Sequence, residues 1–273
     1  MASASHRAGV LAGLLGALAV AVPSAVGAAG PDGRFESRES SHFVLHQDVG
    51  HARRSGLRGA DRFERDVLAV LENAYRNLDA QLGLRPPRKL KVFVYAPEAF
   101  DAAFSGLFGF AVAGFHADAI RVRGGEVVTV ALASTLRHEL VHATLDAAAP
   151  SLVLPAWLNE GLAEWFEHRS LGQRGLAPSQ LAALRDAARA GAWLPIGALA
   201  APGLGHLDLE RARIGYLTAL ALVDHLARRR APGGLPAFVE VLLRTRDPER
   251  ALRRVYGLGA LELEAELRRE LGV

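Results

Sequence analysis

The runs that predict β-strands are confined to one half of this chain. Alternating or β-branched apolar stretches occur before residue 133, whereas the sequence beyond it has almost only helical spacing. These runs are His42–His46, Leu90–Tyr95, Ile120–Val122 and Val127–Leu132. Gly124-Gly125 separates the last two and predicts a hairpin. Pro31–Ser41 predicts a polar linker and Phe100–His116 a Gly-rich loop, so the order as a whole predicts an α+β fold with a small mixed sheet.

Helical patterns account for most of the remaining sequence. Arg62–Leu84 carries an apolar stripe, and Pro155 opens a helix that ends before Gly172. Five further helices follow: Ser179–Ala190, Ala212–Arg229, Leu235–Leu243, Pro248–Tyr256 and Leu261–Leu271. We therefore divide the chain into an α/β half, 30–173, and a helical half, 174–273.

The first 29 residues have the composition of a secretory signal peptide. Met1–Arg7 is short and positively charged, and Ala8–Val22 is apolar. Pro23 and Ser24 interrupt that run, and small residues follow. The apolar run is shorter than the roughly 20 residues that a membrane-spanning helix needs. We expect an exported protein of the periplasm, cell envelope or exterior without an integral membrane span after signal removal. An uncut membrane anchor is the alternative.

Composition limits the chemistry that the chain can perform. The sequence has no cysteine, so a metal site must be built from histidine and carboxylate side chains. The formal net charge is +3, and acidic residues alternate with the arginines, as in Arg62–Asp66. No basic stripe with interleaved aromatic residues occurs, which disfavours a nucleic-acid partner.

The segment His138-Glu139-Leu140-Val141-His142 carries the clearest chemical pattern. We expect a helix over 136–145, capped by Ser134 or by the threonine that follows it. Residues four apart lie on one helix face, so both imidazoles can reach one ion at ~2.0–2.1 Å. Glu139 then lies beside the ion rather than on it. The alternative is a helix with two surface histidines.

A catalytic zinc site generally needs a third protein ligand, and Glu160 supplies one. It lies on the helix that Pro155 opens, one turn before Glu164. The connection after His142 is short enough for this helix to fold back beside the first. Gly161 has no Cβ, so we expect it to allow a close approach of these two helices.

HELVHATLD followed by LPAWLNEGLAEWFE resembles the gluzincin arrangement of zinc peptidases, and most of all the bacterial peptidase-MA-like proteins. The two helices are specific to that pattern, and softer similarity covers most of the chain after residue 30. The resemblance implies a zincin-like fold and one zinc ion. It also implies roles for four residues: the metal ligands His138, His142 and Glu160, and the general base Glu139. Glu164 matches an acidic residue that hydrogen-bonds the first ligand histidine in thermolysin-like enzymes, and Asn159 precedes the third ligand as in both groups.

The chain departs from the better-known gluzincins in two respects. Seventeen residues separate His142 from Glu160, slightly fewer than in thermolysin and the aminopeptidases. The aminopeptidase sequence GAMEN is also absent. These differences argue against that aminopeptidase family and leave the direction of substrate binding open.

Other polar residues are weaker candidates for the site. Tyr216 corresponds to the gluzincin tyrosine that donates to the oxyanion, and an interfacial packing role is the equal alternative. His206 is a weaker candidate from a loop, and His116 could line the cleft. His42 and His46 alternate on a strand, and we expect them to be structural.

The sequence therefore predicts an exported zinc metallopeptidase that acts on peptides or proteins. Main-chain pairing of an extended peptide with an edge strand, Ile120–Val122 or Val127–Leu132, would suit such a substrate. Two alternatives stay open: a binding or scaffold protein in which zinc only braces two helices, and a metal-free helical interaction domain. Cleavage preference, endo- or exopeptidase action and oligomeric state are not determined by these patterns.

Overall fold

The structure is a computed structural model that describes residues 35–48, 50–104 and 113–273, with only the backbone described within 50–58. The predicted signal segment, residues 1–29, lies outside these ranges, so it stays a prediction. Within them, no helix combines the length and apolarity that crossing a membrane requires.

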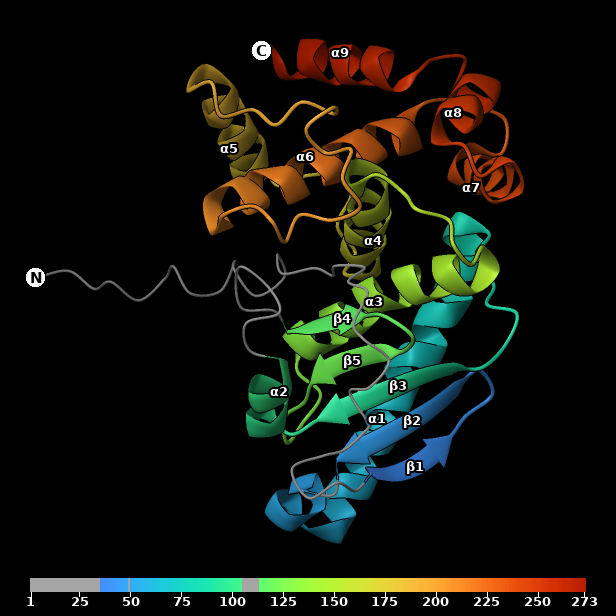
Figure 1. The fold of residues 1–273 in the computed structure, drawn as a ribbon, viewed down its shortest axis with the longest axis vertical. Helices are drawn as coiled ribbons and strands as arrows, with labels where there is room; N and C mark the ends of the chain where they lie inside the picture. The colour runs from blue at the N-terminus through green and yellow to red at the C-terminus, as the bar shows by residue number, and fades with distance from the viewer. Residues whose placement is uncertain (1–34, 49, 105–112) are drawn as a thin grey trace, which may run out of the picture.

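A five-stranded mixed sheet forms one end of the molecule, and helices form the other (Figure 1). The strand order is β1-β2-β3-β5-β4, with parallel pairing of β2, β3 and β5 and an antiparallel strand at each edge. The strands are β1 Phe35–Glu39, β2 Phe43–Asp48, β3 Leu90–Tyr95, β4 Gly114–His116 and β5 Ile120–Arg123. The predicted α+β class with a small mixed sheet is confirmed.

Two helices, α1 (Gly50–Leu82) and α3 (Val130–Ala148), cover one face of the sheet. Alternate side chains of β2, β3 and β5 point to these helices and are almost fully buried: Phe43, Leu45, Val92, Val94, Ile120 and Val122. Each such apolar side chain contributes roughly 1.5–3 kcal/mol when it leaves water. The opposite face carries a separate aromatic cluster in which Phe93, Tyr95 and Phe115 pack on α2 (Pro97–Phe104).

The predicted hairpin is wrong in its second strand. β5 pairs with β4, which lies in the segment expected to be a loop, and Val130–Leu132 is the first turn of α3. Thr129 explains the difference, because its side chain accepts a hydrogen bond from the backbone N–H of Leu132 at 3.1 Å. The expected caps, Ser134 and its neighbour, lie inside the helix.

Two N-terminal boundaries also differ from the prediction. Phe35–Glu39, expected to be part of a linker, is the edge strand β1, whose backbone pairs with β2. Arg38 on β1 also bonds to Glu64 and Asp61 of α1, so the strand is held from two sides. Helix α1 begins at Gly50 rather than Arg62, and among its described side chains Phe63 is the first that belongs to the main apolar cluster.

The helical half agrees closely with the prediction. After α4 (Ala156–Ser170), the structure forms α5 Pro178–Arg189, α6 Leu209–Arg228, α7 Gly234–Thr245, α8 Pro248–Tyr256 and α9 Ala260–Leu271. Helix α4 packs along α6 and also contacts α3, so it lies between the sheet and the helical half (Figure 1). The main apolar cluster is continuous across both halves.

Gly161 permits a close approach of α4 to α6, rather than to α3 as we expected. A Cβ at this position would lie 2.6 Å from the carbonyl oxygen of Ala219 and 2.6 Å from Val223 Cγ2, both on α6. Those distances are far below ordinary contact, so only glycine permits α4 and α6 to pack this tightly.

The first backbone N–H groups of α4 donate hydrogen bonds to residues that are distant in the sequence. Pro155 precedes the helix and offers no side-chain cap, but the backbone N–H of Ala156 donates to the carbonyl of Ala201 at 2.7 Å. The loop that contains Ala201 is itself held to α9. Glu264 accepts hydrogen bonds there from the Trp193 indole at 2.7 Å and from the backbone N–H of Ile196 at 3.0 Å.

Candidate metal centre

The two histidines of α3 lie on one face of the helix, as predicted. His138 and His142 are 2 % and 6 % exposed, and their ring centroids are 5.0 Å apart. The alternative of two surface histidines is therefore excluded. Their Nε2 atoms are enclosed and have no hydrogen-bond partner among the described residues.

Glu160 brings a carboxylate to both imidazoles from α4. Its Oε2 atom lies 3.4 Å from His138 Nε2 and 3.6 Å from His142 Nε2. Two ligand atoms that each lie ~2.05 Å from a tetrahedral ion are about 3.3 Å apart, so both distances to Glu160 Oε2 are close to that spacing. His138, His142 and Glu160 could hold a metal ion.

The hydrogen-bonding state of these atoms fits that interpretation. Both carboxylate oxygens of Glu160 and both of Glu139 are enclosed without a hydrogen-bond partner in the described part of the chain. A buried polar group left in this state costs about 1–3 kcal/mol, and more if it is charged. A cation beside them would offset that cost, and the donor set of two imidazoles and one carboxylate is one that zinc accepts.

Each histidine is oriented through its second ring nitrogen. His142 Nδ1 lies 3.0 Å from Asn159 Oδ1, so it donates its proton there and leaves Nε2 with a free lone pair. His138 Nδ1 lies 3.7 Å from Glu164 Oε1 and 3.5 Å from Glu167 Oε2. Asn159 and Glu164 thus lie at the Nδ1 atoms of His142 and His138, on the side of each ring away from Nε2.

Glu167 is a member of this group that the sequence analysis missed. It is 4 % exposed and follows Glu160 and Glu164 at positions i, i+4 and i+7 of α4, so one face of the helix carries three carboxylates. That spacing was visible in the sequence. Together with His138, Glu164 and Glu167 form a second group compatible with a metal, but it shares His138 with the first.

Burial and mutual charge perturb the ionisation of the group strongly. Burial, the largest cause, raises the pKa of Glu139 from 4.5 to about 7 against the opposing effect of His138 and His142. Burial and then Glu167 raise the pKa of Glu164 well above its usual range. Burial alone would lower the pKa of His138, but the surrounding carboxylates outweigh it and raise the pKa. A site with this excess of buried acid attracts a cation.

Glu160 behaves in the opposite way. Burial would raise its pKa, but the adjacent His142 and His138 lower it below the usual value. The carboxylate of Glu160, the predicted third ligand, is therefore well suited to stay ionised. Its position opposite both imidazoles makes it available to a cation.

Tyr216 lies on α6 and is 1 % exposed. Burial, followed by the charges of Glu160, Glu164 and Glu139, raises its pKa well above the usual value, which places its hydroxyl within electrostatic reach of the group. The structure thus brings Tyr216 toward the predicted site. It leaves His206 exposed on a loop, away from the group.

The other histidines considered from the sequence have separate environments. His42 stacks on Tyr75 and bonds to Glu72 at 2.7 Å, and His46 stacks on Phe93, so both have structural contacts. His116 is buried on β4 and is close enough to His142 to be affected by its charge.

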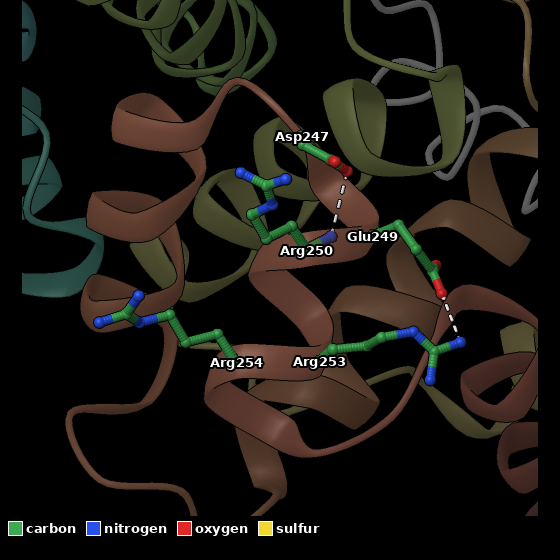
Figure 2. A pocket seen from close by; sticks show the side chains of 5 residues that line it. All are labelled: Asp247, Glu249, Arg250, Arg253 and Arg254. Atoms are coloured by element: carbon green, nitrogen blue, oxygen red, sulfur yellow. Dashed lines mark hydrogen bonds and ion pairs between the residues drawn. The ribbon is translucent and has the colours of Figure 1, made fainter.

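A second charged feature lies on α8 and the turn before it. Figure 2 shows the side chains that line a pocket there: Asp247, Glu249, Arg250, Arg253 and Arg254. Arg253 pairs with Glu249 at 2.8 Å, and the backbone N–H of Arg250 donates to Asp247 at 3.0 Å (Figure 2). None of its residues belongs to either metal-compatible group.

Neither a scan of protein-family models nor a search of curated proteins finds a match to this chain. The interpretation of the site therefore depends on its residues and their geometry.

Proposed function

We propose that this chain is a zinc-dependent metallopeptidase that hydrolyses peptide bonds, with His138, His142 and Glu160 as the metal ligands. One observation carries the proposal: Glu160 Oε2 lies 3.4 Å from His138 Nε2 and 3.6 Å from His142 Nε2, and Glu139 is fully buried beside them. On this proposal the fold is zincin-like and the chain belongs with the peptidase-MA-like gluzincins. Export follows only from residues 1–29 and is part of the proposal.

A zinc ion held by His138, His142 and Glu160 would supply the activation of water, because such an ion lowers the pKa of a bound water to about 7. Glu139 would accept a proton from the attacking water and deliver it to the nitrogen of the leaving amine. A base works best when its pKa is near the working pH, and in the metal-free site burial raises the pKa of Glu139 to about 7. Proton transfer of this kind contributes about 10²–10⁴-fold to the rate.

Tyr216 is the donor proposed for the oxygen that becomes negative on the substrate carbonyl. Its raised pKa keeps the hydroxyl protonated at neutral pH, which a donor requires. It approaches from α6, whereas the two imidazoles come from α3. The substrate would then bind between the sheet and the helical half.

The substrate strand is expected along β4. The expected edge strand Ile120–Val122 is part of β5, which lies between β3 and β4, and the other expected edge strand, Val127–Leu132, is not a strand. β4 is the edge strand nearest to α3 (Figure 1). Among the described residues β4 pairs with β5 alone, and an extended peptide that pairs with its other edge would pass beside the metal ligands.

The test uses metal analysis beside a peptide-library digest, for the wild type and for Glu139→Gln. We expect about one zinc per chain in both proteins, and a loss of hydrolysis of about 10²–10⁴-fold in the variant alone. Glu126→Gln is the matched control, because Glu126 is exposed and outside the group. Absence of stoichiometric zinc would exclude the site, and equal digestion by wild type and Glu139→Gln would leave the zinc-braced scaffold as the better description.

A further inference from the structure

His116 is a buried histidine that the proposed reaction does not use. It lies on β4, is 8 % exposed, and forms no hydrogen bond through its ring to any described residue. A neutral imidazole has one donor and one acceptor, so this ring has both available for a ligand.

The register of the sheet fixes the side to which His116 points. Gly114 pairs with Val122 and His116 pairs with Ile120, and both partners are fully buried under α3. Because side chains alternate along a strand, His116 lies on the same face as these partners. Phe115, between them, points to the opposite aromatic cluster.

The same strand lies directly against the helix that carries the metal ligands. A Cβ on Gly114 would lie 2.7 Å from Thr135 Cγ2, so β4 touches α3 at that residue. Thr135, His138 and His142 occupy positions i, i+3 and i+7 and share one face of the helix. β4 therefore contacts α3 on the helix face that also carries the two imidazoles.

Electrostatics support this placement independently of the register. Burial, followed by the charge of His142, lowers the pKa of His116 to about 3. Arg121 contributes less, and Asp118 acts in the opposite direction. The ring of His116 is thus neutral at physiological pH.

β4 is an edge strand whose pairing, within the residues that the structure describes, involves only β5. A peptide strand added to its other edge places one residue opposite His116, on the same face. Directly opposed side chains in a sheet have Cβ atoms about 4.5–5.5 Å apart, which is contact distance for an imidazole.

We propose that His116 is a specificity-determining residue that contacts the side chain of the substrate residue paired with it and favours an uncharged, hydrogen-bonding side chain such as Ser, Thr, Asn or Gln. This inference rests on the proposed peptidase function. It follows from a buried polar ring that β4 directs to the sheet face covered by α3, the helix that carries both histidines. A site built around such a ring prefers a partner that completes its hydrogen bonds.

The test compares cleavage profiles of a random peptide library for the wild type, His116→Phe and His116→Gln. His116→Phe keeps a ring and removes both nitrogens, whereas His116→Gln keeps a neutral donor and acceptor. We expect one position near the scissile bond to lose its polar preference by about 10-fold in His116→Phe and to keep most of it in His116→Gln. Each variant should still bind about one zinc per chain. His46→Phe, on the opposite sheet face, should leave the profile unchanged.

Unchanged profiles in His116→Phe, a uniform loss at all positions, or loss of zinc would each overturn the inference. A second measurement separates it from the proposed function. Immobilised Glu139→Gln protein, with and without His116→Phe, selects peptides from the same library by binding. If the wild type binds zinc but cleaves nothing, the proposed function fails, and the enriched position in the bound peptides still decides the role of His116.

Discussion

Substitution of Gly161 by alanine tests the packing that positions the candidate site. The added Cβ would lie 2.6 Å from both Ala219 O and Val223 Cγ2. Optimal carbon contacts are about 3.5 Å or longer, so α4 and α6 must separate by roughly 1 Å. Overpacking of this kind costs about 1–3 kcal/mol of unfolding free energy. Urea denaturation of the zinc-loaded protein measures that loss.

The same separation should reduce peptide hydrolysis. Tyr216 shares the α4-facing side of α6 with Ala219 and Val223, at positions i, i+3 and i+7, and Glu160 directly precedes Gly161. A misplacement of about 1 Å can lower the rate by about 10². We therefore expect kcat/KM to fall by about 10²-fold.

The matched control is Gly197→Ala. A Cβ at Gly197 meets no atom within 4 Å, so this variant should keep the wild-type stability and rate. A Gly161→Ala protein that unfolds at the wild-type urea concentration and hydrolyses peptides at the wild-type rate would refute the packing argument.

Three further predictions concern the site and its support. In metal-free protein, the folded Glu139 keeps a proton that the unfolded chain loses between pH 4.5 and about 7, so its contribution to stability falls as pH rises through that range. Above it, metal-free Glu139→Gln should be more stable than wild type by up to about 3 kcal/mol. Urea denaturation of both proteins at pH 5 and pH 8 measures this difference, and the same difference at both pH values would contradict the prediction. Glu164→Ala and Glu167→Ala should each weaken zinc binding by about 10–100-fold in a chelator competition, because both lie behind His138; an unchanged affinity removes that role. Glu264→Ala should lower the unfolding free energy by about 2–4 kcal/mol, because it leaves two buried donors unpaired, and a thermal melt like that of wild type would argue against this.

The elements that the sequence predicted well are those determined by local patterns. The five helices of the helical half begin and end within a few residues of their predicted positions, because capping groups and apolar stripes repeat within each helix. The histidine pair of α3 and the carboxylate of Glu160 were also predictable. The two histidines are one helical turn apart, and one short connection brings the helix of Glu160 back beside them, so their positions relative to one another depend on local sequence.

The elements that were predicted wrongly depend on partners far away in the chain. β4 has only three residues and is a strand because β5 supplies its backbone partners, so no period of its own identifies it. Val127–Leu132 has β-branched residues, but the cap at Thr129 turns its second half into helix. Gly161 could be identified as a contact point, although only the structure shows that the contact is with α6.

The way in which α4 begins has a consequence for the timing of metal uptake. Its first backbone donors bond to a loop that α9 holds through Glu264, and α9 is synthesised long after α3 and α4. A nascent chain that already contains all three ligand residues would still lack the contacts that orient Glu160. We therefore expect an emerging chain to bind zinc weakly until α9 has folded onto that loop, and on the proposed function hydrolysis would begin only after α9 has been synthesised.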